Sequence, residues 1–152
     1  MSVAKEITAG LAGGLAGGTA MAALMMAGQR AGLIETPPPV QIERTLEGRA
    51  GVADRTSSTQ ETALGMGLHM LLSAAFGGGY GLLRAAIDVP AVPGGPLYGL
   101  CVYALTFTGI GPTLGLTPSP KGQQPIAVGR QLMLHAVYGT VTALVARQVR
   151  QQ

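Results

Sequence analysis

The chain has 152 residues, of which 47% are hydrophobic and only 11% are charged, and its formal net charge at pH 7 is +3. Typical soluble proteins carry about 25% charged residues, so the surface of this chain would be short of ions in water. The ten basic residues are scattered, which excludes the basic stripe of a nucleic-acid-binding protein, and the single cysteine, Cys101, excludes an internal disulfide.

Charged residues divide the chain into four long uncharged runs of 23, 22, 32 and 16 residues. A helix needs about 20 apolar residues to cross the hydrocarbon core of a bilayer. We therefore predict an all-α polytopic membrane protein in one domain, residues 1–152, with a glycine-rich soluble bundle as the alternative. The predicted transmembrane helices cover residues 7–29, 60–84, 96–114 and 126–148.

The first run combines many glycines with very low polarity. Small residues recur at intervals of four and form a groove along one helix face: Gly10, Gly14, Gly18 and Ala22. Because helices in a bilayer associate through close packing, such a groove predicts a docking face for another helix. A signal peptide, a phosphate-binding loop and a pore-lining glycine zipper are the competing interpretations; the run is too long for the first and lacks the lysine of the second.

The polar connection at 36–58 begins with three prolines that end the first helix. The segment VQIERTLEGR within it predicts a short interfacial helix that lies flat on the bilayer, with apolar side chains on the membrane and Glu43 and Glu47 in water. Ser58 and Glu61 have the spacing of a capping box at the start of the second transmembrane helix.

Prolines limit the third helix, which we expect to begin at Pro96 and to kink or end near Pro112. The fourth uncharged run is short, but Arg130 and Arg147 at its ends lengthen it by extending their side chains toward the interface.

The two halves of the chain are weakly similar. Gly28, Gly32 and Leu33 after the first run correspond to Gly111, Gly115 and Leu116 after the third. A histidine followed by small residues at intervals of four stands in the second and fourth runs: His69, Ser73, Gly77 and Gly81, and His135, Gly139, Ala143 and Arg147. We interpret the chain as two helical hairpins in a parallel repeat, with Ser73, Gly77, Gly139 and Ala143 as further helix-packing positions.

His69 and His135 are the only histidines, and each heads a ridge of small residues that predicts contact with another helix. An interhelical hydrogen bond to a backbone carbonyl or a tyrosine is the simplest role. The alternatives are axial ligation of a haem or chlorophyll-type pigment, or a proton or ion path. Catalysis lacks support, because Cys101 stands alone and Ser73 beside His69 has no acidic partner, so we predict neither an enzyme nor a bound metal.

The glycine-rich first run, the Gly-Leu turn before prolines and the HxxYG pattern at His135, Tyr138 and Gly139 resemble the YagU-like family of small bacterial inner-membrane proteins, which has no assigned biochemical function. Leu72 and Ser73 depart from that pattern in the second run. The resemblance implies a multi-pass protein of the bacterial cytoplasmic membrane and brings no active site. From the packing faces we expect an accessory or assembly subunit of a larger membrane complex, or a homo-oligomer, whose partners are lipid and other transmembrane helices and which needs no cofactor. The alternative is a haem- or pigment-binding protein, or a proton or solute transporter, that uses the two histidines.

Overall fold

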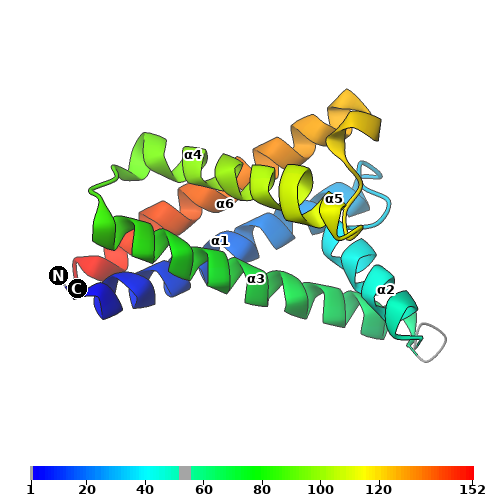
Figure 1. Cartoon of the computed structure of the whole chain (residues 1–152), viewed down its shortest axis with the longest axis horizontal. Helices are drawn as coiled ribbons and strands as arrows, with labels where there is room; N and C mark the ends of the chain where they lie inside the picture. The colour runs from blue at the N-terminus through cyan, green and yellow to red at the C-terminus, as the bar shows by residue number, and fades with distance from the viewer. Residues whose placement is uncertain (1, 52–55) are drawn as a thin grey trace.

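The computed structural model describes residues 2–51 and 56–152, and the regular secondary structure in this part of the chain is helical, as the sequence predicts. Three long helices dominate it (Figure 1): α1 (Val3–Arg30), α3 (Ser58–Ala86) and α6 (Pro125–Arg150). The shorter elements are α2 (Pro38–Ala50), α4 (Ala91–Tyr103), the π-helix η2 (Ala104–Ile110), α5 (Gly111–Thr113) and the 3₁₀ turn η3 (Pro120–Gly122).

Local sequence signals set several helix ends. The N-terminus of α3 has a capping box in which the Ser57 hydroxyl accepts from the backbone N–H of Gln60, and the Gln60 side chain accepts from the Ser57 backbone. The predicted pair, Ser58 and Glu61, is therefore wrong by one residue, because a glutamine three residues after a serine serves the same purpose. The third predicted helix, which corresponds to α4, begins at Ala91 rather than Pro96, with an extended residue, Val92, just inside it.

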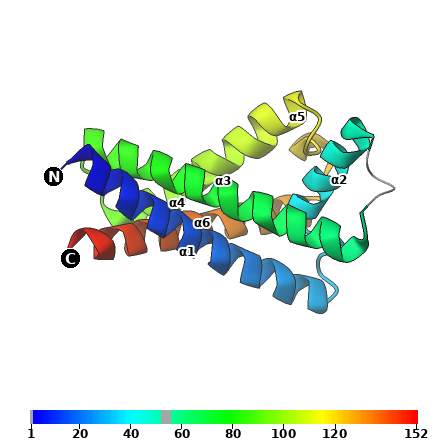
Figure 2. The same cartoon turned by 90° about the horizontal axis from the view of Figure 1, so that it is seen from below.

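The helices α1, α3 and α6 and the segment α4–η2 form a bundle in which α1 and α6 lie in the middle. The helix α1 packs against α3 and against α6, and α6 packs in addition against α4. Figures 1 and 2 show that α1 and α4 run away from the end that holds both chain termini, and that α3 and α6 return to it. An ion pair between Arg150 and Glu6, 3.5 Å long, joins the two termini at that end. The halves thus repeat in the same direction, as the sequence alignment implies.

Glycines allow the helix backbones to approach closely. On one face of α1, side chains added at Gly10, Gly14 or Gly18 would collide with Ser73, Gly77 or Gly81 of α3. On the adjacent face, side chains at Gly13 and Gly17 would collide with the backbone of α6 at Thr142 and Tyr138. The glycines of the predicted groove therefore pack against α3, Gly13 and Gly17 form a second face against α6, and both faces are filled by helices of this chain.

The same contact recurs between α4 and α6. Gly95 lies against Gly139 and Ala143 there, much as Gly14 lies against Ser73 and Gly77 in the first half. The turns that follow also match in detail, because Leu33 N–H donates to Gly28 O and Leu116 N–H donates to Gly111 O, each over 2.8 Å. Gly32 and Gly115 have positive φ angles of 70° and 62°, a backbone conformation that favours glycine.

The two halves differ in length between these matched points. Gly99 lies against Gly139 on α6 as Gly18 lies against Ser73 on α3, so these two glycines correspond. From Gly18 to Gly28 there are ten steps along the chain, and from Gly99 to Gly111 there are twelve. The longer stretch contains the π-helix η2, whose turns are wider than those of an α-helix. The π-helix absorbs the additional residues, so both halves still end in the same turn.

Two helices of the described chain, α1 and α3, are long and apolar enough to cross a membrane by length and composition. The helix α4 has only 13 residues before the π-helix takes over, and α6, although 26 residues long, is less apolar because Arg130, Gln131 and Arg147 lie within it. Large apolar side chains, such as Leu71 (67% exposed) and Ile126 (67%), cover the outside of the bundle.

The connection at 36–58 forms the predicted short helix, α2, although residues 52–55 of it lie outside the described part. Its orientation corrects the prediction, since Glu43 and Glu47 are 6% and 8% exposed and do not face water. The cause is that α2 packs against α3, with the backbone of Val40 lying over Gly65.

Candidate functional site: an apolar chamber between the two halves

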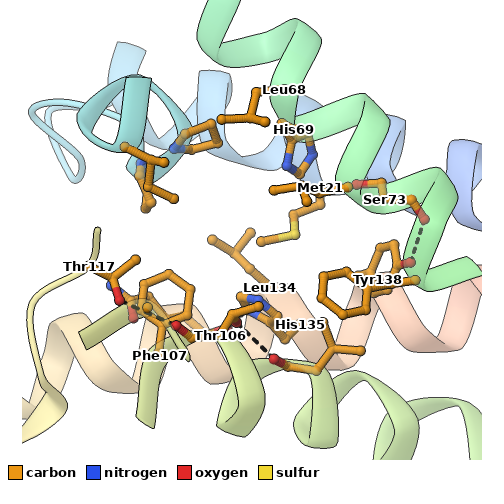
Figure 3. Close-up of a pocket in the computed structure, with 18 of the residues that line it drawn as sticks. Met21, Leu68, His69, Ser73, Thr106, Phe107, Thr117, Leu134, His135 and Tyr138 are labelled. Atoms are coloured by element: carbon orange, nitrogen blue, oxygen red, sulfur yellow. Dashed lines mark hydrogen bonds between the residues drawn. The ribbon is translucent and has the colours of Figure 1, made fainter. Parts of the chain in front are cut away.

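A cavity of about 360 Å³ lies where the two halves diverge, and residues from α1, α2, α3, α4, η2, α5 and α6 line it. Figure 3 shows open space between one wall that carries Leu68, His69 and Met21 and a facing wall that carries Phe107, Leu134 and His135. Most of the lining is aliphatic or aromatic. We call this cavity the chamber. It brings both predicted histidines to one site, on opposite walls.

His69 makes an interhelical hydrogen bond. Its Nε2 lies 3.0 Å from the backbone oxygen of Gly18 on α1, and a carbonyl only accepts, so Nε2 carries the proton. This is the simplest of the roles that the sequence allows. Because the bond uses Nε2, the nitrogen by which histidine most often ligates haem is occupied at His69.

His135 has a different partner. Its Nδ1 lies 2.8 Å from the backbone oxygen of Gln131, one turn earlier on the same helix, and therefore carries the proton. Its ring packs edge-on against Tyr103 and Phe107, with centroid distances of 5.4 and 5.5 Å. Within the described chain Nε2 of His135 has no hydrogen-bond partner, so in the neutral imidazole it presents a free lone pair. Such a nitrogen is suited to accept a hydrogen bond or to ligate a metal ion.

A chain of amides holds Gln131 in place beside His135. The Gln123 amide nitrogen donates to Pro118 O over 3.0 Å, and the Gln131 amide nitrogen donates to the Gln123 side-chain oxygen over 3.2 Å. Because the backbone oxygen of Pro118 can only accept, the nitrogen of the Gln123 amide faces it and the oxygen faces Gln131. The Gln131 atom that faces Gln123 is therefore nitrogen, and the other atom of that amide is oxygen. That oxygen, Oε1, is buried and has no partner in the described chain. Gln131 also lines the chamber, one turn from His135, but this oxygen is buried within the wall.

The π-helix supplies the wall opposite His69. Thr106, Phe107 and Ile110 of η2 all line the chamber. The Thr117 hydroxyl donates to Thr106 O over 3.3 Å, and the backbone N–H of Gly111 donates to the same oxygen in the wide pattern of a π-turn. Segments of π-helix often occur at functional sites, and here the segment adds residues to the wall of the chamber.

The helix α2 closes one end of the chamber with Pro38, Pro39, Ile42 and Leu46. Arg49 near its C-terminus donates to the backbone oxygen of Leu114 over 2.6 Å, in the turn that follows α5. The connection of the first half is thereby fastened to the second half, and residues of both halves line the chamber.

The acidic residues of α2 face α3. Glu43 and Glu47 lie one turn apart on the buried side, and Thr56 donates to the Glu47 carboxylate over 2.8 Å. Removal from water, and then the hydrogen bond and negative charge of Glu47, raise the pKa of Glu43 above its usual range. Arg44 opposes that shift and forms an ion pair with Glu61 over 2.8 Å.

The predicted packing residues lie in helix contacts rather than in the chamber, except Ser73, which belongs to both. Ser73 contacts Gly18 and accepts a hydrogen bond from Tyr138 at its backbone oxygen over 2.7 Å, as Figure 3 shows. Ala22 is partly buried beside the cluster that contains Met21 and Met25. Sequence reasoning missed Gln131 and the π-helical wall. The signals available were the glutamine one turn before His135 and the unequal spacing of the two halves.

No protein-family model, curated protein or solved structure matches the chain. The resemblance to the YagU-like family therefore stays a prediction.

Proposed function

We propose that the chain is a small integral membrane protein that crosses the bilayer four times and binds a small, mainly apolar molecule in the chamber. The chamber itself is the observation that carries the proposal. Ligand sites are usually concave, mostly apolar and equipped with a few polar groups, and they commonly lie between the helices of a bundle. A cavity of about 360 Å³ lies within the usual range of such sites, about 300–1,000 Å³.

The four-span topology is supported by the four uncharged runs of the sequence and by the up-and-down course of the four helical segments. The segments α1 and α3 meet the length and composition of a membrane helix. The segments α4–η2–α5 and α6 lie alongside them in the same bundle, and their outer side chains Leu97 and Leu144 are exposed. A bacterial cytoplasmic membrane suits this composition, with both termini on one side and α2 in the interface on the other.

A role as an accessory subunit or homo-oligomer is the second candidate. The exposed apolar side chains on α3, such as Leu64 and Leu82, favour it because they suit another helix as well as lipid. The glycine faces of α1 do not favour it, because α3 and α6 of the same chain already fill them. Light scattering of the purified protein in detergent separates a monomer from an oligomer.

The membrane part of the proposal is tested by extraction at high pH. Carbonate should leave the protein in the membrane pellet, and reporter fusions should place both termini on the same side of the membrane. Release into the supernatant would refute the membrane assignment and the four spans with it.

The binding part is tested by filling the chamber. Naphthalene should bind to the protein in lipid nanodiscs above the level of empty discs, and Leu134→Trp should abolish that excess because Leu134, 4% exposed, lines the chamber. Leu144→Trp on the exposed side of α6 is the matched control and should bind like the wild type. Equal binding by both variants would refute a ligand in the chamber.

A further inference from the structure

We infer that the ligand of the chamber is an apolar molecule that carries a hydroxyl group, and that Nε2 of His135 accepts the hydrogen bond from this hydroxyl. The inference rests on the proposed binding function and specifies its ligand class. It follows from the donors and acceptors that the chamber wall leaves unused.

The hydrogen-bond donors of the wall are mostly committed to the protein. The hydroxyls of Thr106, Thr117 and Tyr138 donate to the backbone oxygens of Val102, Thr106 and Ser73, and the ring N–H groups of both histidines donate to backbone oxygens. Among the hydroxyl and ring N–H groups that line the chamber in the described chain, the Ser73 hydroxyl alone is uncommitted.

Acceptor atoms of the wall are left free. In the described chain no hydrogen bond involves Nε2 of His135 or Nδ1 of His69. Oε1 of Gln131, on the residue one turn before His135, also lacks a partner, but it is buried within the wall. An unsatisfied acceptor in an apolar setting is costly, and a ligand with a donor removes that cost. A ligand with acceptors only, such as an ether or a ketone, would leave Nε2 of His135 unsatisfied. The chamber therefore discriminates in favour of a donor.

The position of the imidazole is set before any ligand enters. The Gln131 backbone oxygen holds Nδ1, and Tyr103 and Phe107 hold the ring from two sides. A preorganised acceptor loses little freedom on binding, which favours affinity. The volume also bears on the ligand, since about 360 Å³ is near the small end of ligand sites and suits one or two rings or a bent alkyl chain better than a tetrapyrrole.

The test compares two probes that differ in one group, 1-naphthol and its methyl ether 1-methoxynaphthalene. Binding is measured by equilibrium dialysis against the full-length protein in nanodiscs, with empty discs as the reference for partition into lipid. We expect the naphthol to bind about tenfold more tightly than the ether, which corresponds to about 1.4 kcal/mol.

His135→Phe should remove this preference while the ether still binds, because a phenyl ring preserves the packing against Tyr103 and Phe107. His135→Gln should restore part of it, since the amide supplies an oxygen acceptor. Ile126→Phe, an exposed position of α6, is the matched control and should keep the full preference.

The outcomes separate the two levels of the proposal. If neither probe exceeds the empty discs, the binding function fails. If both bind equally to the wild type, the chamber binds apolar molecules but the hydroxyl class is wrong, and a preference that survives in His135→Phe refutes the assignment to His135. A Soret or red absorption band in the purified wild-type protein that disappears in His135→Phe would replace the hydroxyl ligand by a tetrapyrrole.

Discussion

Replacing Gly77 by alanine should move α1 and α3, the two long helices of the first half, apart. A Cβ atom at Gly77 would lie 2.5 Å from the Cα atom of Gly14 and closer still to the backbone oxygen of Gly10. Ordinary contacts of a Cβ atom begin near 3.4 Å. The backbones of α1 and α3 must therefore move apart by about 1 Å, and no flexible side chain is there to yield. Overpacking of this kind costs about 1–3 kcal/mol, more than the gain of up to about 1 kcal/mol from replacing a helical glycine by alanine.

The matched control is Gly67→Ala on the same helix. Nothing lies within 4 Å of a Cβ atom at Gly67, so this change should be neutral or should stabilise the protein by up to about 1 kcal/mol. The free energy of unfolding is measured by titration with SDS in mixed micelles, followed through the near-ultraviolet circular dichroism of the four tyrosines. Equal stability of the two variants would refute the close backbone contact between α1 and α3.

Two further predictions concern ionisable side chains. The pKa of Glu43 is raised in the folded protein, whereas in the unfolded chain it is near 4.5, so the folded state binds this proton more tightly. The free energy of unfolding should therefore fall as the pH rises from about 4.5 through the pKa of Glu43 in the folded protein. Glu43→Gln should flatten this dependence in SDS titrations across that range, and an unchanged slope would show that another group causes it. His69→Leu should cost about 0.6 kcal/mol, the average for a hydrogen bond between membrane helices, while His69→Gln should cost less; a larger loss in the glutamine variant would contradict the bond to Gly18.

The helical class of the chain and its repeat could be predicted because they depend on local patterns. Uncharged runs, prolines and the spacing of small residues mark the helices, and the alignment of Gly28 with Gly111 predicts two corresponding turns, which in the structure have the same hydrogen bonds. The choice of partner for each small residue could not be predicted. Gly13 and Gly14 are neighbours in the sequence, yet one faces α6 and the other α3, and that choice depends on how all four segments pack.

The orientation of α2 shows where a local pattern gives the wrong answer. Charged residues at intervals typical of a water-exposed face predict that Glu43 and Glu47 are solvated, and both are buried. The residues that decide the outcome lie elsewhere in the chain: Gly65 permits close contact with Val40, and Glu61 attracts Arg44. The chamber depends on such distant contacts throughout, so the sequence identified its two histidines without indicating that they share a cavity.

The two histidines of the repeat use different ring nitrogens for their hydrogen bonds. His69 and His135 occupy equivalent positions, and in each half a glycine-rich helix passes close to the small residues that follow the histidine. In the first half the imidazole reaches across to Gly18, whereas in the second half it turns back to Gln131 on its own helix. The second half is also the one with two additional residues and a π-helix, whose Phe107 packs against the His135 ring. The same change that breaks the symmetry of the repeat thus lines the chamber and accompanies the free Nε2 of His135, which is the atom that we propose accepts the hydroxyl of the ligand.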